Sequence, residues 1–219
     1  MRTSPVLPGA EDATENDGTP PLNDVVGLLL AAGGGRRMGG GGKALLRVGG
    51  RTLVERGVRA LRDGGCGRVV VVLGARAAEV RRLGVLGGAV AVDNPAWESG
   101  MGSSLRTGIE AVAAAGGGAA LVLLVDQPGV GAAAVARVRG AYRSPDALAA
   151  AGYGGRRGHP VLIGAGHFAG VRAAAHGDRG ARDYLRERAA VVRLVECGDI
   201  ADPADLDTPG DLAAFGTPH

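Results

Sequence analysis

The stretch Val25-Val26-Gly27-Leu28-Leu29-Leu30-Ala31-Ala32 runs directly into Gly33-Gly34-Gly35. A continuous apolar run of this length, ending in glycines, is typical of a strand buried on both faces of a parallel sheet. Further apolar runs of strand length, and segments with the helical spacing of apolar residues, alternate along the chain. This alternation predicts a three-layer α/β/α fold with a mostly parallel, Rossmann-like sheet that binds ligands at the carboxyl ends of its strands. The other expected strands are 69–73, 89–92 and 120–125, and the expected helices are 52–63, 75–83, 103–114 and 132–142.

The last third of the chain departs from this alternation. Residues 148–153 and 159–163 flank the turn Gly154-Gly155-Arg156-Arg157-Gly158, a pattern that indicates a hairpin. We therefore expect a mixed sheet. Short helices at 168–174 and 181–188, a strand at 191–197 and a closing helix from Thr208 complete the expected order.

The first 24 residues differ in composition from the rest of the 219-residue chain. They contain four prolines, scattered acidic residues and no apolar periodicity, which predicts a flexible tail. Residues 25–219 are then expected to form a single domain. This part has 24 basic residues against 17 acidic ones, and such an excess suits an anionic ligand such as a nucleotide, although a solvated basic surface explains it equally well.

The composition also excludes several classes of function. Aromatic residues make up only 3% of the chain, which leaves little for stacking on nucleic-acid bases. No apolar run approaches the roughly 20 residues of a membrane-spanning helix, and the first residues do not resemble a secretory signal. We therefore expect a cytoplasmic protein without nucleic-acid or membrane partners. Cys66 and Cys197 have neither the spacing of a zinc site nor that of a disulfide framework.

The glycine-rich segment from Gly33 to Lys43 leaves the first strand at its carboxyl end, where backbone N–H groups can converge on a phosphate. It is not a Walker A loop, because Arg37 and Ala44 stand where that loop needs Gly and Ser or Thr. Met38 likewise replaces the third glycine of a dinucleotide fingerprint. Lys43 is the only lysine among 25 basic residues. Because a compact ammonium can follow a phosphate through charge transfer, Arg37 and Lys43 are candidate catalytic residues.

The segment Leu30-Ala31-Ala32-Gly33-Gly34-Gly35-Arg36-Arg37-Met38-Gly39 resembles the opening motif of the MobA-like nucleotidyltransferases, especially their molybdenum cofactor cytidylyltransferase branch. The present loop is one residue longer, with Gly40-Gly41-Gly42 where the family usually has a pair ending in proline. The resemblance covers about residues 25 to 215. It continues in Asn94-Pro95, Gly100-Met101-Gly102-Ser103-Ser104-Leu105-Arg106-Thr107-Gly108-Ile109, Leu124-Val125-Asp126-Gln127-Pro128, Gly158-His159-Pro160, Gly177-Asp178-Arg179-Gly180-Ala181-Arg182 and Asp205-Leu206-Asp207-Thr208-Pro209.

The resemblance implies the nucleotide-diphospho-sugar transferase type of fold and a Mg²⁺-dependent transfer of CMP from CTP to a phosphorylated acceptor, with release of pyrophosphate. The implied acceptor is the molybdopterin form of the molybdenum cofactor, and a molybdenum enzyme would receive the product. Arg37, Lys43 and Asp126 would be catalytic. The resemblance assigns nucleotide binding to Leu30, Ala31, Ala32, Gly33, Gly34, Gly35, Arg37, Lys43, Ser103 and Ser104, and acceptor binding to His159, Asp178 and Arg182.

The position of Asp126 after an apolar strand also favours a metal site, because its carboxylate should emerge at the carboxyl end of that strand beside the glycine loop. Asp207, in a loop before the last helix, is the second candidate Mg²⁺ ligand. Each has an alternative role as a turn or cap residue. One of Ser103 and Ser104 could cap the following helix, and His159 could be structural.

Three alternative functions remain open from the sequence. GTP could replace CTP with the same chemistry. The chain could be an NAD(P)H-dependent reductase whose glycine loop holds a dinucleotide, or a carrier that delivers the cofactor without catalysis. The presence of both Asp126 and Asp207 argues against the reductase, because hydride transfer has no use for a magnesium pair.

Overall fold

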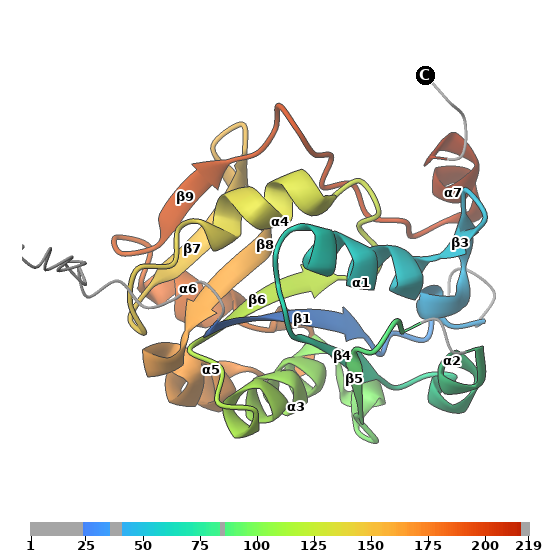
Figure 1. The fold of residues 1–219 in the computed structure, drawn as a ribbon, viewed down its shortest axis with the longest axis horizontal. Coiled ribbons are helices and arrows are strands. Elements are labelled where there is room, and N and C mark those ends of the chain that lie inside the picture. Colours follow the sequence, from blue (N-terminus) through green and yellow to red (C-terminus); the bar gives the residue numbers. More distant parts are fainter. Residues whose placement is uncertain (1–23, 36–40, 84–85, 216–219) are drawn as a thin grey trace, which may run out of the picture.

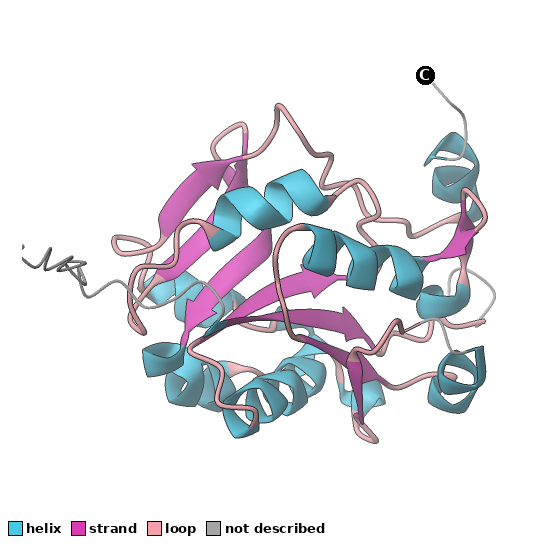
Figure 2. Ribbon diagram, viewed as in Figure 1, coloured by secondary structure: helices cyan, strands magenta, loops and turns pink. Residues whose placement is uncertain are grey.

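The computed structural model describes residues 24–35, 41–83 and 86–215, and its centre is a seven-stranded sheet with helices on both faces (Figures 1 and 2). The strand order is β5-β4-β1-β6-β8-β7-β9. In this sheet β8 runs antiparallel to both of its neighbours and the other strands are parallel to one another, so the predicted mixed sheet is confirmed. The strands are β1 (Val25–Ala31), β4 (Val69–Leu73), β5 (Val90–Asp93), β6 (Ala119–Leu124), β7 (Leu148–Tyr153), β8 (Arg156–Gly164) and β9 (Arg193–Glu196).

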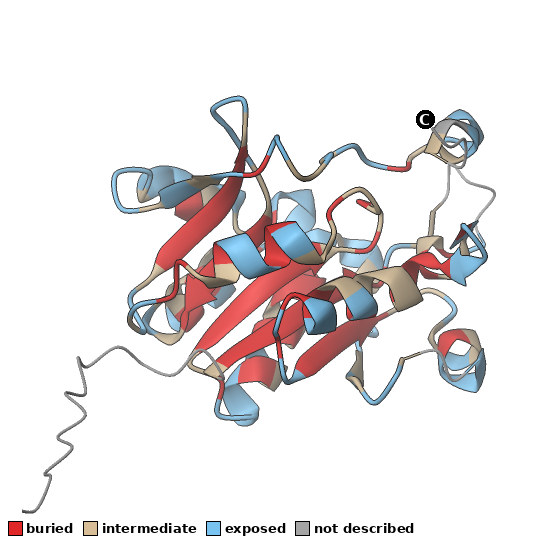
Figure 3. Ribbon diagram, turned by 45° about the horizontal axis from the view of Figure 1, so that its top comes forward, coloured by how far each residue is buried: buried red, intermediate tan, exposed pale blue. Residues whose placement is uncertain are grey.

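Two helical layers cover the sheet, and each has its own apolar core. Side chains of β1 alternate between them: Val25 and Leu29 belong to one core, Leu28 and Leu30 to the other. Figure 3 shows the buried sheet between half-exposed helices, as expected for central strands buried on both faces. One layer consists of α1 (Leu53–Asp63) and α4 (Ala132–Arg139), the other of α3 (Met101–Ala114), α5 (Phe168–Ala174) and α6 (Arg182–Glu187), and α2 (Ala77–Leu83) and α7 (Pro209–Phe215) lie at the periphery.

Most predicted elements are present, with shifts at their ends. Helix α1 starts as predicted, because Thr52 forms a capping box with Glu55. The helix predicted over 132–142 stops at Arg139, and Gly140 caps its end. The strand predicted over 191–197 is shortened to β9. The short pair β2 (Arg47–Val48) and β3 (Arg51–Thr52) was not predicted, because strands of only two residues are too short to show an apolar periodicity.

The strands at the centre of the sheet end at one edge, and that edge determines where ligands can bind. β1 pairs with β6 in parallel register, so that Leu30 lies opposite Leu124. The glycine loop that follows β1 and the Asp126 segment that follows β6 therefore emerge side by side. Across the described ranges, none of the helices has the length and apolar character needed to cross a bilayer.

Candidate active site

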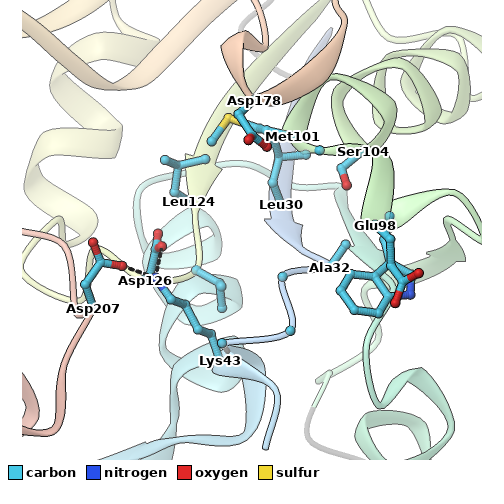
Figure 4. A pocket seen from close by; sticks show the side chains of 16 residues that line it. Leu30, Ala32, Lys43, Glu98, Met101, Ser104, Leu124, Asp126, Asp178 and Asp207 are labelled. Atoms are coloured by element: carbon cyan, nitrogen blue, oxygen red, sulfur yellow. Dashed lines mark hydrogen bonds and ion pairs between the residues drawn. The ribbon is translucent and has the colours of Figure 1, made fainter. Parts of the chain in front are cut away.

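A cavity of about 660 Å³ opens at the carboxyl ends of β1 and β6 (Figure 4). It brings together most of the residues that the sequence assigned to the nucleotide and the metal. Ala31 does not reach it, because this residue is buried in the core, and Arg37 lies outside the described residues. The lining consists of Leu30, Ala32, Gly33, Gly34, Gly35, Lys43, Trp97, Glu98, Gly100, Met101, Ser104, Leu124, Val125, Asp126, Asp178 and Asp207.

Lys43 joins the two acidic residues that were predicted to bind metal. Its Nζ donates hydrogen bonds to Asp126 Oδ2 at 2.7 Å and to Asp207 Oδ1 at 2.6 Å (Figure 4). Burial alone would lower the pKa of the Lys43 ammonium, but the hydrogen bonds to both carboxylates outweigh burial and raise the pKa above its ordinary value. Lys43 is therefore a cation at neutral pH, held between two anions.

Backbone hydrogen bonds bring these three residues together from distant parts of the chain. Lys43 N donates to Gly33 O at 3.3 Å, which folds the glycine loop back onto the end of β1. Gly42 has a φ of 77°, a conformation that favours glycine at this return. At the other side of the site, Leu206 N donates to Asp126 O at 2.8 Å. This bond sets Asp207 beside Asp126.

The pair of carboxylates offers the kind of oxygen ligands that a divalent cation such as Mg²⁺ prefers. Asp126 and Asp207 direct oxygens at one position, now occupied by the Lys43 ammonium, and the triad as a whole carries a net negative charge. Mg²⁺ is usually bound by one or two carboxylates together with phosphate oxygens and water. No third His, Cys, Asp or Glu joins this pair to form a metal cluster in the part of the chain that the structure describes. The remaining ligands of such an ion would come from a substrate.

Ser103 and Ser104 are held by Asn94, whose role the sequence analysis did not identify. Asn94 Nδ2 donates to Ser103 Oγ at 2.8 Å and to Ser104 Oγ at 3.0 Å. Ser103 Oγ in turn donates to the carbonyls of Ala96 and Gly100 and does not line the cavity. Neither serine caps α3, because Gly100, with a φ of 108°, takes that position. Ser104 alone of the two reaches the cavity.

The Trp97 ring forms one side of the cavity and packs on the glycine loop. A Cβ atom at Gly34 would lie 3.0 Å from the ring, and one at Gly74 would lie 2.6 Å from the Trp97 side chain. Both positions therefore need glycine if the ring is to stay where it is. Trp97 therefore both packs against the glycine loop and lines the cavity.

A second cavity of about 400 Å³ adjoins the first and shares Leu30, Met101, Leu124 and Asp178 with it. His159 and Arg182, assigned to the acceptor, line this second cavity, and Asp178 lies at the boundary. The residues that the resemblance assigns to the acceptor thus lie beside those that it assigns to the nucleotide.

The sequence analysis places His159 at the start of a strand. In the structure His159 lies within β8, because pairing with β7 extends β8 back to Arg156. Burial lowers the pKa of His159 to about 4, although the side chain keeps some exposure to the cavity. The histidine is therefore neutral at pH 7. Its backbone carbonyl accepts a hydrogen bond from the Tyr153 hydroxyl at 2.7 Å.

Known proteins are similar to this chain in sequence and in fold. Nicotine blue oxidoreductase of Paenarthrobacter nicotinovorans is 42% identical over 191 residues, which are 84% of this chain and 92% of that protein. The Rv0371c homologue from Mycobacterium sp. strain JC1 is 31% identical, with a TM-score of 0.72 over 88% of this chain and 97% of that one. A nucleotidyl transferase from Methanothermobacter thermautotrophicus is 25% identical, with a TM-score of 0.72 over 87% and 95%.

The fold is thus that of the nucleotide-diphospho-sugar transferases. The family model described as "MobA-like NTP transferase domain" matches residues 27–192, which begin in β1 and include Lys43 and Asp126. Asp207 lies beyond the matched range. Because the model covers well over half of the chain, this protein belongs to the MobA-like NTP transferase domain family.

Proposed function

We propose that the protein is a Mg²⁺-dependent nucleotidyltransferase that moves CMP from CTP to a phosphorylated acceptor, the molybdopterin form of the molybdenum cofactor. The observation that supports this proposal most strongly is the contact of Lys43 with both Asp126 and Asp207 beside a glycine loop. In such an arrangement the lysine would bind the triphosphate, and the two carboxylates would bind the metal ion that accompanies it. The product would pass to a molybdenum enzyme.

The reaction needs positioning and charge more than proton transfer. An oxygen of the acceptor phosphate attacks the α-phosphorus of CTP in line; the new O–P bond forms as the bond to the β-phosphate oxygen breaks, and pyrophosphate leaves with the electron pair. Because the attacking phosphate oxygen is already an anion, no general base is required. The neutral His159 is compatible with this scheme.

The residues of the first cavity divide this work. Gly33 to Gly35 line the cavity, where their backbone N–H groups would bind the phosphates, and Lys43 would donate to an oxygen that becomes more negative as the bond breaks. Asp126 and Asp207 would hold Mg²⁺, which supplies neutralisation of the phosphate charge. Rv0371c of Mycobacterium tuberculosis has been crystallised in complex with manganese, and that observation concerns the relative alone.

The base would be read at Ser104, the serine that reaches the cavity. A hydroxyl can both donate and accept, so together with backbone groups it can match the amino and carbonyl groups of cytosine. Asn94 fixes the Ser104 hydroxyl from behind at 3.0 Å. GTP remains the nearest alternative donor.

A second candidate function is an NAD(P)H-dependent reductase, and one observation favours it. The relative with 42% identity is named as an oxidoreductase that acts on nicotine blue. In that case the glycine loop would hold a dinucleotide pyrophosphate, and Asp126 and Asp207 would need no metal. A carrier without catalysis is the third possibility from the sequence.

The test is a thermal-shift series on the full chain with CTP, GTP, ATP, UTP and NADPH, each with and without Mg²⁺, followed by an assay of pyrophosphate release. A ligand that binds only the folded state raises the melting temperature. We expect a Mg²⁺-dependent shift with CTP. A shift confined to GTP would change the base alone, whereas a shift with NADPH that ignores Mg²⁺ would refute the transferase. Pyrophosphate release unchanged by Asp126→Asn would also refute it.

A further inference from the structure

The second cavity contains two arginines that form no ion pair with a carboxylate of the described residues. Arg157 on β8 and Arg182 at the start of α6 both line it. Arg157 Nη1 donates to the Leu185 carbonyl at 3.2 Å, and within the described ranges neither arginine forms an ion pair with a carboxylate. By contrast, Arg179 at the same rim pairs with Asp183 at 3.1 Å.

These two positive charges lie close enough to repel each other. Burial lowers the pKa of Arg157, and the neighbouring charge of Arg182 lowers it further. Two guanidinium groups held together without an anion cost free energy in the empty protein, and an anion placed between them would recover it. His159 adds no charge here, because its own low pKa keeps it neutral at pH 7.

Part of the cavity wall is aliphatic and part is polar. The aliphatic side chains come from α3, β6, β8 and α6, and we call them the aliphatic floor: Leu105, Val122, Val161, Ile163 and Leu185. The polar part includes Gln127, His159, Asp178 and Asp205. Transfer of a ligand's apolar surface onto the aliphatic floor is favourable. The cavity therefore offers a ligand both cationic side chains and apolar surface.

The arginine pair also lies within reach of the reacting end of the site. His159 is close enough to Asp126 on one side, and to Arg157 and Arg182 on the other, for all three charges to act on its pKa. The two cavities share Leu30, Met101, Leu124 and Asp178, so the arginine-lined cavity adjoins the cavity of Lys43 and Asp126.

We infer that Arg157 and Arg182 bind the phosphate of the acceptor, and that the aliphatic floor packs against the face of the ring system attached to that phosphate. This inference rests on the proposed function and specifies how a phosphate monoester acceptor is held. Arg157 and Arg182 then determine that the acceptor carries a phosphate. The aliphatic floor favours a phosphate with an organic ring over inorganic phosphate.

Phenyl phosphate is a suitable probe because it combines a dianion with an apolar ring. Calorimetric titration of the full chain, saturated beforehand with CMP to occupy the first cavity, should show binding about tenfold tighter than for inorganic phosphate. Arg157→Gln and Arg182→Gln should each weaken phenyl phosphate binding by about tenfold, the effect of one lost hydrogen bond between charged groups. Arg157→Lys and Arg182→Lys should retain part of the affinity.

The matched control is Arg172→Gln. It removes the same charge from α5, where Arg172 pairs with Glu110 at 2.6 Å outside both cavities, and should leave phenyl phosphate binding unchanged. Melting temperatures of all variants separate lost binding from lost folding. If a glutamine variant fails to fold, the corresponding lysine variant is compared with wild type in its place.

Two outcomes would overturn the inference. Loss of phenyl phosphate binding in the presence of CMP would mean that the probe occupies the first cavity. Equal affinities in wild type and both glutamine variants would mean that the arginines do not hold the phosphate. Failure of the proposed function has a different signature, because absence of pyrophosphate release from every nucleotide would leave these binding constants unaffected.

Discussion

At the scale of single residues, Lys43 is the side chain on which the active site depends most. Its ammonium is the cation between Asp126 and Asp207, and in the proposed function it would contact the triphosphate. Lys43→Ala should reduce CMP transfer by about 100-fold or more, since loss of one donor to developing charge costs that much in comparable sites. Pyrophosphate release measured at saturating CTP checks this expectation.

The control for this change is Lys43→Arg, which keeps the charge but replaces a point cation by a planar group. It should fold with the same melting temperature as wild type and remain impaired in turnover. If Lys43→Ala kept wild-type turnover, the lysine would be a structural partner of the two carboxylates and the proposed chemistry would be wrong.

His159 should make stability depend on pH in a defined window. Its pKa is about 4 in the folded protein, against 6.5 for an unperturbed histidine, because burial disfavours the charged form. The unfolded chain therefore binds more protons between these values, and the free energy of unfolding should fall as the pH falls from about 6.5 to about 4. The total loss is up to about 3 kcal/mol.

Chemical denaturation of wild type and His159→Gln at several pH values measures this contribution. The difference between the two proteins should change across pH 4 to 6.5 and stay constant above it. A difference that is constant over the whole window would show that His159 titrates normally in the folded state.

At the scale of secondary-structure elements, the packing of α3 on the sheet depends on Gly108. A Cβ atom there would lie 2.6 Å from Leu28 Cδ1 and 3.1 Å from Val72 Cγ2, both in the core. Gly108→Ala should therefore destabilise the protein by about 1 to 3 kcal/mol through overpacking, despite the better helix propensity of alanine. Because α3 also carries Ser104, CTP binding should weaken too.

Gly67→Ala is the matched control, since a Cβ atom at that position would have no neighbour within 4 Å and the residue needs no positive φ. It should melt at the wild-type temperature or slightly above. Thermal unfolding of the two variants side by side distinguishes a packing effect from a general effect of replacing glycine. Equal melting temperatures for both variants would contradict the close contact of α3 with β1.

The central strands could be predicted from the sequence because their environment is uniform. A strand buried on both faces reads as an unbroken apolar run, and β1, β4 and β6 are found within a residue or two of the predicted ranges. The β2–β3 pair lacks such a signal. The end of α4 was misplaced because apolar residues continue past Gly140 as Ala141 and Tyr142, which are buried after the helix has ended.

Many of the residues that line the candidate site could be picked out from the sequence, but their contacts could not. The single lysine after a glycine loop and the aspartate after an apolar strand can both be recognised from their neighbours in the sequence. The meeting of Lys43 with Asp207 joins residues 164 positions apart and depends on backbone bonds that no local pattern announces. The contact of Asn94 with the two serines was not predicted, because an asparagine that follows a strand and precedes a proline is typical of an ordinary turn.

At the scale of the whole molecule, residues 1–23 should be dispensable. Their prolines and acidic residues show no apolar periodicity, whereas the Asp24 carbonyl already accepts a hydrogen bond from Gly118 N at 3.0 Å. Deletion of residues 1–23 should leave melting temperature and turnover unchanged, as judged by thermal unfolding and pyrophosphate release. A protein that no longer folds would show that this segment belongs to the domain.

The control for this deletion is a longer deletion that removes residues 1–26. It removes Val25 and Val26, both fully buried in β1, and should abolish folding. The two truncations differ by three residues and thereby locate the start of the folded unit. Similar behaviour of both would contradict the assigned start of β1.

The two cavities adjoin along Leu30, Met101, Leu124 and Asp178, which line both of them. If two substrates react across this boundary as proposed, one molecule with a cytidine part tethered to an aryl phosphate part should occupy both cavities. Once the first part is bound, the second meets its subsite at an effective concentration set by the tether, and the gain over either part alone can reach about 10² to 10⁴. The proximity that would let two substrates react would thus also make the site susceptible to a single bivalent inhibitor.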